Sequence, residues 1–163
     1  MQDAKKHLKW CLKQNKGIKI VKPSENLTTA YLRKSRNALK SMDINAEADI
    51  TEWAISASYY AKYFAVYALL AKIGAKSEIH DCTIALFEYL FSDTIPEETI
   101  QELKHSKEDR IETQYYTQET NIDLPQTRKK TKKFVLYIES TIDNLNPEKI
   151  AALQKKLKNL TTE

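Results

Sequence analysis

The sequence predicts an all-α protein, and three observations support that fold class. The 163 residues include only two glycines and four prolines, and a protein of many short strands would need more of these residues for its turns. Ala, Leu, Lys and Glu are abundant, and these residues favour long helices. Apolar residues also recur at spacings of three and four, the period of an amphipathic helix. We expect one domain over residues 1–163, since a chain of this length can bury a continuous core.

Two short apolar patterns predict the helices that open the chain. Leu8, Cys11 and Leu12 share one side of a first helix at about 2–14, and residues 17–23 are typical of a loop. Ser24 is a good N-cap for a second helix, which we expect to run to about Met42.

The long central segment, at about 46–73, is too apolar on too many sides to be a surface helix. We therefore expect it to be buried at the centre of the protein. A left-handed C-cap at Gly74 would end it, and Ser77 is placed to N-cap the next helix just before Glu78. Two neighbouring faces of this helix differ in size. The small face carries Ala54, Ala57, Ala61, Ala65 and Ala68. The bulky face carries Tyr60, Tyr63, Phe64 and Tyr67.

Three more helices follow from apolar spacing and from proline positions. A fourth is expected at about 78–91, and Pro96 with Thr94 before it opens a fifth that runs to about Tyr116. The fifth is unusually polar, so its second half should need tertiary or intersubunit contacts to be stable. A loop at 121–125 and a sixth amphipathic helix, which continues to about Leu145, come next. Pro147 then begins a tail helix through Leu160.

The net charge of +4 conceals a polarised distribution, because the ends of the chain are basic and the middle is acidic. Residues 1–22 and 128–133 are rich in lysine, whereas residues 78–119 hold eleven acids against three bases. Such a pattern could serve phosphate binding or head-to-tail association. The alternative is that these charges belong to ordinary solvated helix faces.

Cysteine usage and hydropathy bear on location and cofactors. Cys11 and Cys82 are isolated, with no CxxC pair, which favours a reducing compartment. No apolar run is long enough to span a membrane and the N-terminus lacks a signal-peptide core, so we expect a soluble, cytoplasmic protein. His7 and Cys11 stand four residues apart, but two ligands are too few, so we expect no metal and no cofactor.

The order of several segments resembles the HEPN family, the domain named for higher eukaryotes and prokaryotes nucleotide-binding. The segments are YYAKYFAVYALLAKIG, KSEIH, FEYLF, RIETQY and the basic-aromatic helix after them, which together span about 27–145. The resemblance implies an up-and-down bundle of four to five main helices, with a core at about 24–145 and peripheral segments at 1–22 and 147–163. It also implies a homodimer with a shared polar cleft.

The same resemblance points to candidate site residues. Ribonucleases of this family carry an arginine followed four to six residues later by histidine; Arg110 matches the arginine, but Tyr115 stands where the histidine would be. A small stand-alone branch instead follows the arginine with an acidic residue and tyrosine, here with Gln114 in the acidic place. We expect Arg110, Gln114, Tyr115, Tyr116 and His80 to contact nucleotide or RNA, and any catalysis to involve Arg110 and Tyr115.

Each candidate has an ordinary structural alternative. Arg110 could form an ion pair with a nearby acid, and either tyrosine could pack inward. His80 could be a capping or packing residue, kept neutral by the helix N-terminus.

Three functions remain open at this point. The first is a nucleotide- or RNA-associated dimer that partners a minimal nucleotidyltransferase in a toxin-antitoxin-like or regulatory module. The second is a metal-independent ribonuclease that uses Arg110 at a dimer cleft. The third is a non-catalytic helical adaptor.

Overall fold

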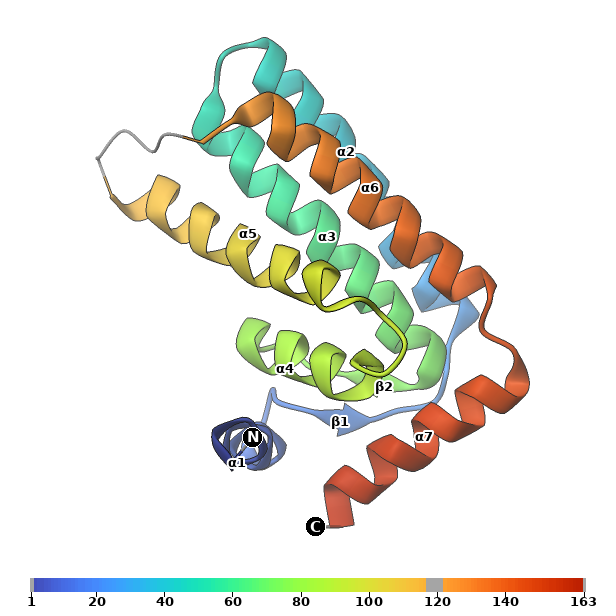
Figure 1. The fold of residues 1–163 in the computed structure, drawn as a ribbon. Helices are drawn as coiled ribbons and strands as arrows, with labels where there is room; N and C mark the ends of the chain where they lie inside the picture. The colour runs from blue at the N-terminus through green and yellow to red at the C-terminus, as the bar shows by residue number, and fades with distance from the viewer. Residues whose placement is uncertain (1, 117–121, 163) are drawn as a thin grey trace.

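The described residues of this computed structural model, 2–116 and 122–162, form a helical bundle, as the sequence predicts (Figure 1). Helices α2, α5 and α6 surround the central α3, while α4 and α1 pack across one end and α7 lies beside that end. The helix bounds are α1 Gln2–Lys13, α2 Glu25–Glu47, α3 Thr51–Ile73, α4 His80–Phe91, α5 Glu97–Tyr115, α6 Leu124–Asp143 and α7 Pro147–Thr162. No helix within the described ranges is both long and apolar enough to cross a bilayer.

The central helix α3 is buried on nearly every side, which confirms its predicted position. Four of the five alanines on its small face are completely buried, and α2 lies close against that face. The approach is close enough for the Ser35 hydroxyl to donate a hydrogen bond to the Ala61 carbonyl at 2.6 Å. On the bulky face, Tyr31 of α2 packs against Phe64 and Tyr67, with ring centroids 6.3 and 4.8 Å away.

Several predicted helix ends are confirmed. Ser24 caps α2 by accepting a hydrogen bond from the Leu27 amide at 3.2 Å. Gly74 ends α3 in the left-handed conformation, with φ of 79°, and α7 begins at Pro147. The start of α6 was not predicted: Asp123 caps the helix by accepting from the Gln126 amide, so α6 begins within the loop expected at 121–125, whose residue 121 lies outside the described residues.

The turn between α2 and α3 was predicted too early. Helix α2 continues to Glu47 and α3 begins only at Thr51. The chain reverses at Asp49, which adopts a positive φ of 58°. Aspartate reaches this conformation more easily than most residues, but the segment contains no Gly or Pro, so a turn here was hard to predict.

Ser77 does not cap α4, contrary to the prediction, because the helix begins at His80 after Ile79. The carbonyl of Ser77 instead accepts hydrogen bonds from the hydroxyls of Tyr67 and Thr83. Ser77 is therefore fixed in a buried turn between α3 and α4.

A short ladder joins two connections that the sequence analysis treated as loops. Strand β1, Lys19–Ile20, pairs antiparallel with β2, Ala75–Lys76. The Val21 amide extends the contact by donating to the Gly74 carbonyl at 2.9 Å. Strands of two residues are too short to show an alternating pattern, which is why the sequence did not reveal them.

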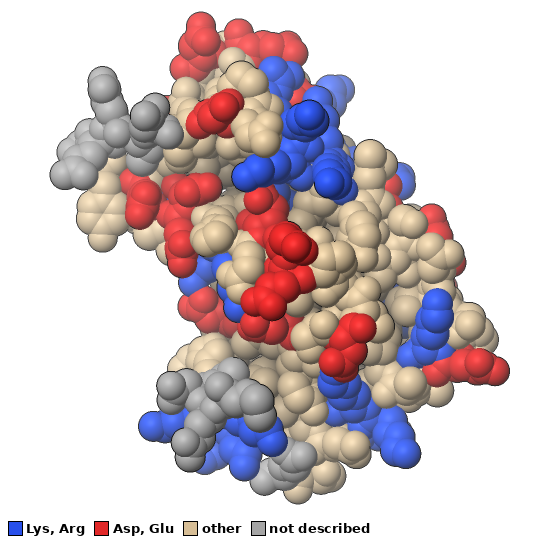
Figure 2. Space-filling model, viewed as in Figure 1, with Lys and Arg blue, Asp and Glu red and all other residues tan. Residues whose placement is uncertain are grey.

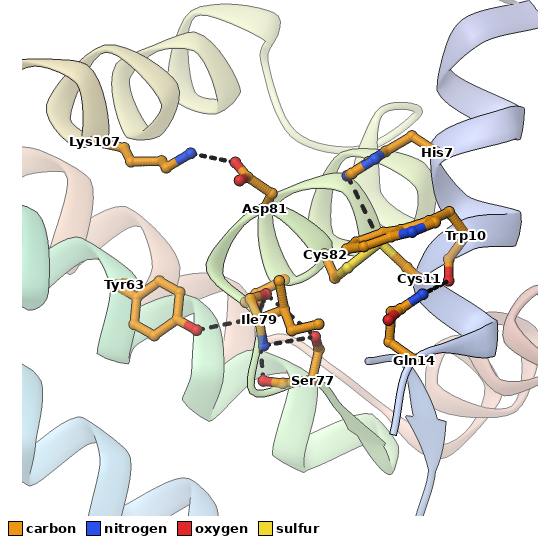
Figure 3. The surroundings of a disulfide bond; sticks show 11 residues. His7, Trp10, Cys11, Gln14, Tyr63, Ser77, Ile79, Asp81, Cys82 and Lys107 are labelled. Atoms are coloured by element: carbon orange, nitrogen blue, oxygen red, sulfur yellow. Dashed lines mark hydrogen bonds and ion pairs between the residues drawn. A yellow bond between two sulfur atoms is a disulfide. The ribbon is translucent and has the colours of Figure 1, made fainter. Parts of the chain in front are cut away.

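The expectation of two isolated cysteines is wrong, because Cys11 and Cys82 form a disulfide (Figure 3). The two residues are 71 positions apart in sequence, but α1 packs against α4 and brings their Cα atoms to 5.6 Å. This pairing is a product of tertiary packing, so no local spacing could have indicated it.

The conformation of Gly74 leads to a stability prediction. A Cβ at this position would lie 2.5 Å from the Val21 carbonyl oxygen, in addition to the cost of a positive φ. We expect Gly74→Ala to lower the free energy of unfolding by about 2–3 kcal/mol, measured by urea denaturation. The control is Lys76→Ala two residues later, which loses an exposed ion pair with Glu78 and should cost less than about 1 kcal/mol. Equal losses in the two variants would contradict this account of Gly74.

Candidate functional site

Helix α5 carries the main candidate residue and is held to the bundle by few apolar contacts. Its buried residues are Ile100, Leu103 and Ser106, all before the last two turns. The second half of the helix therefore depends on polar and aromatic contacts with α3, in line with its polar sequence.

Arg110 lies in this second half and packs against two tyrosines of α3. Its guanidinium carbon lies 5.2 Å from the ring centroid of Tyr59 and 5.7 Å from that of Tyr60. One terminal nitrogen, Nη1, also donates a hydrogen bond to the Tyr60 hydroxyl at 3.2 Å. Aromatic faces attract a cation through their quadrupole, so these rings hold the guanidinium without supplying a negative charge.

The positive charge of Arg110 is not matched by a carboxylate. Arg110 forms no ion pair with any acidic residue in the described part of the chain, and its buried Nε has no hydrogen-bond partner there. Buried donors without a partner are uncommon, and each carries a cost of about 1–3 kcal/mol. The ion pair that offered an alternative role for Arg110 is thus not found among these residues.

Arg110 borders a pocket of about 400 Å³ between α2, α3 and α5. Trp53, Tyr60 and the small residues between them form the α3 wall, while hydroxyl and amide groups come from α2 and from Gln114. The lining residues are Ala38, Ser41, Asn45, Trp53, Ser56, Ala57, Tyr60, Arg110 and Gln114. A cation, two aromatic rings and several neutral polar groups therefore face one space.

His80 contacts Tyr59 and is not one of the residues that line this pocket. Its Nδ1 lies 2.6 Å from the Tyr59 hydroxyl, and its ring stacks on Tyr63 with centroids 4.3 Å apart. Burial lowers the pKa of His80, and the positive charge of Arg110 adds to the effect. Burial also raises the pKa of Tyr59, so the hydrogen bond between the phenol and the imidazole is favoured with both groups uncharged.

The remaining predicted site residues are more exposed. Gln114 borders the Arg110 pocket one turn beyond the arginine. Tyr115 ends α5 and Tyr116 follows it, with 73% and 64% of their surfaces exposed. Neither tyrosine packs inward, so that alternative is wrong, and neither one lines the pocket.

A buried lysine on α3 fixes the first half of α5, and the sequence analysis did not identify it. Lys62 is only 1% exposed, and its ammonium group donates to the carboxylate of Glu102 at 2.6 Å and to the hydroxyl of Ser106. Burial lowers the pKa of Lys62, while the charge of Glu102 opposes that shift. Its partner Glu102 is 40 residues away in sequence, so no local pattern indicated that the charge of Lys62 is paired inside the bundle.

Trp53 is the second residue that the sequence analysis missed. It is 57% exposed and lines the pocket three and seven residues before Ser56 and Tyr60. This helical spacing places all three on one face of α3, and it was the available signal.

The polarised charges of the sequence form separate regions on the surface. Figure 2 shows acidic side chains over α5 and basic ones over α1 and the beginning of α6. Several basic groups on α6 are paired within the chain: Arg128 and Lys132 both contact Asp43, at 2.8 and 2.9 Å. The α6 cluster is thus partly neutralised, whereas Arg110 is not.

Comparison with known proteins identifies the class of this helical bundle. The family model described as the HEPN domain matches residues 28–149, which is most of the chain. The chain therefore belongs to the HEPN family, as the resemblance predicted. No curated protein matches the chain.

The ion pair of Lys62 and Glu102 leads to the prediction that substituting one partner costs more stability than substituting the other. Glu102→Gln keeps the shape of the side chain but leaves the buried ammonium without a counter-charge, so we expect a loss of about 1–3 kcal/mol. Lys62→Met removes the buried charge itself and leaves Glu102, which is 23% exposed, open to solvent and to Lys130 at 3.9 Å. We expect the smaller loss for Lys62→Met, measured by urea denaturation at neutral pH. The opposite order would mean that the salt bridge does not control the cost.

Proposed function

We propose that the protein binds the phosphate of a nucleotide or of RNA through the pocket beside Arg110. The observation that supports this most is the state of the guanidinium: it is held on two tyrosine rings, lacks a carboxylate partner among the described residues, and borders an open pocket. A phosphate would accept two parallel hydrogen bonds from such a group and balance its charge.

The other walls of the pocket suit the rest of a nucleotide. Trp53 and Tyr60 provide aromatic surface on which a base could stack. Ser41, Asn45 and Gln114 provide neutral hydrogen-bonding groups for a base edge or a ribose. Among the described residues no acid lines the pocket, which favours an anion over a cation as the ligand.

A dimer that joins two copies of this pocket fits the exposed side chains nearby. The turn from α2 to α3, the end of α5 and the start of α6 lie at one end of the bundle (Figure 1). Trp53, Tyr115 and Tyr116 are well exposed there, and large exposed aromatic side chains are typical of interfaces. Two Arg110 side chains in a shared cleft would make a stronger anion site than one.

The partner in this proposal is a minimal nucleotidyltransferase, within a toxin-antitoxin-like or regulatory module. Its basis is the likeness to the small stand-alone HEPN branch, in which an arginine is followed by a tyrosine rather than by histidine. The role of the protein in that module would be binding.

A ribonuclease is the second candidate, and one observation bears on it. His80 contacts Tyr59 beside Arg110, but its Nδ1 is hydrogen-bonded to the Tyr59 hydroxyl and its ring is stacked on Tyr63. Proton transfer needs a group that reaches the substrate within hydrogen-bond distance. His80 therefore fits a packing role better, and binding without cleavage is the stronger proposal.

Substitution of Arg110 tests the binding site directly. We expect Arg110→Ala to weaken binding of a labelled single-stranded RNA or of ATP by at least about tenfold, because a charge-assisted contact is worth roughly 1.5–3 kcal/mol. Fluorescence anisotropy at several salt concentrations measures this, and the salt dependence should decrease with the loss of a phosphate contact. The matched control is Arg36→Ala, which removes an exposed arginine paired with Glu139 on a different face. Equal affinities for wild type and Arg110→Ala would reject the site.

The same RNA samples, held in chelator and run on a denaturing gel, distinguish binding from catalysis. Intact RNA is the expected result. Cleavage by the wild type that disappears in Arg110→Ala would instead establish a metal-independent ribonuclease.

The dimer is tested by the mass of the protein in solution. We expect sedimentation equilibrium at micromolar concentration to give twice the chain mass, and Trp53→Asp to shift the equilibrium toward the monomer. The control is Leu136→Asp. Leu136 is an exposed apolar residue on α6 that lies outside the Arg110 pocket. A monomeric wild type would remove the basis for a shared cleft.

A further inference from the structure

Three metal-binding side chains meet where α1 crosses α4, away from the Arg110 pocket. His7 and Cys11 lie one turn apart on α1, and Cys82 comes from the first turn of α4 (Figure 3). Their ligand atoms all lie within 4.8 Å of one another. We propose that the chain with its disulfide reduced binds one zinc ion through His7, Cys11 and Cys82.

The distance between the His7 nitrogen and the Cys11 sulfur suits tetrahedral zinc. Zinc binds histidine nitrogen at about 2.0–2.1 Å and cysteine sulfur at about 2.3 Å, which places a nitrogen and a sulfur about 3.6 Å apart at the tetrahedral angle. Nε2 of His7 and Sγ of Cys11 are 3.6 Å apart. Once their bond is broken, the two sulfurs must move to about 3.8 Å apart, the spacing that two zinc–sulfur bonds of about 2.3 Å give at the tetrahedral angle.

The backbone around the site is held by contacts other than the disulfide. The Ile18 amide donates to the Cys11 carbonyl at 3.1 Å, and the Glu78 amide donates to the Lys16 carbonyl at 2.8 Å. Leu8 is also buried in the core beside these residues. These contacts tie α1 and its following loop to the start of α4, so the ligands stay together after reduction.

A metal ion has a route to the site and a place for a fourth ligand. His7 lines a pocket of about 340 Å³ that opens to solvent, whereas both cysteines are fully buried. A water molecule in this pocket would complete the tetrahedron. The pocket also carries three acids and two lysines, and both lysines are paired with acids, Lys104 with Glu88 and Lys107 with Asp81. The remaining charge is one negative unit, from Glu108, which favours a cation.

The chemistry has two steps, and both balance. A reducing dithiol gives two electrons and two protons to the Cys11–Cys82 bond, which becomes two thiols while the reductant becomes a disulfide. Zinc then replaces the two thiol protons, which pass to the buffer, and His7 binds through the lone pair of its neutral ring. Disulfide and zinc are mutually exclusive at this site, because each one uses both sulfurs.

Cobalt(II) is the probe for the test, because its absorption reports thiolate ligands and tetrahedral geometry. The full-length protein is reduced, freed of reductant under anaerobic conditions and titrated with CoCl2, with the disulfide form titrated in parallel. We expect one cobalt per reduced chain, with thiolate-to-cobalt charge-transfer bands that disappear when zinc is added. The disulfide form should show none of these bands. A reduced wild type without them would overturn the proposal.

Histidine variants distinguish a site that uses all three residues from metal binding by the two cysteines alone. His7→Ala keeps both cysteines, and circular dichroism of its disulfide and reduced forms checks that it is folded before the titration. We expect it to bind cobalt at least about tenfold more weakly, since even outer-shell partners of a metal contribute that much. His105→Ala, an exposed histidine on α5, is the matched control and should bind as the wild type does. Equal affinity in His7→Ala and wild type would reject the three-residue site.

Circular dichroism accompanies each titration. If reduction alone unfolds the chain, refolding at one equivalent of zinc supports the site, and failure to refold argues against it.

Discussion

The burial of α3 is the constraint on which the rest of this structure depends. A helix that is apolar on nearly every side must be covered on every side, and α2, α5 and α6 do this along its length. The cover is of two kinds. Against α2 the contact is close and built on alanines, whereas against α5 it is built on tyrosines and on the charge of Lys62. The Arg110 side chain lies on the second, polar contact.

The way in which Arg110 is held decides what its pocket can attract. A carboxylate partner would neutralise the guanidinium and leave little field for a ligand. Aromatic rings instead fix its position through the π face and leave its full charge facing the pocket. The Tyr59 ring contacts Arg110 while its hydroxyl contacts His80, so one side chain orders both residues. The arginine named by the family resemblance is therefore the one that this tyrosine holds.

Much of the fold could be predicted from local sequence. The ends of α2, α3 and α7 follow from Ser24, Gly74 and Pro147, because capping and backbone preferences act within a few residues. The position of α3 follows from its composition. Arg110 was predicted as a site residue from the resemblance to the family. The charges of α5 alone could not single it out, because the helix carries charged residues on every side.

The features that could not be predicted from the sequence are those that form only when two distant segments of the chain come into contact. The disulfide joins residues of helices α1 and α4, and the buried charge of Lys62 is stable only because Glu102 lies opposite. Asp49 illustrates a different difficulty, since a positive φ at a residue other than glycine leaves almost no mark in the sequence. Each of these is decided by packing, which acts after the local preferences.

The Cys11–Cys82 bond also gives the protein an unusual covalent topology. It closes the chain between them into a ring that contains the whole of α2 and α3. A protease that cuts the exposed turn at Asp49 would open this ring without dividing the protein, because the two pieces remain joined through sulfur. The central hairpin of the bundle is therefore protected from loss by a bond at its far end, and only a cut combined with reduction can release its two halves.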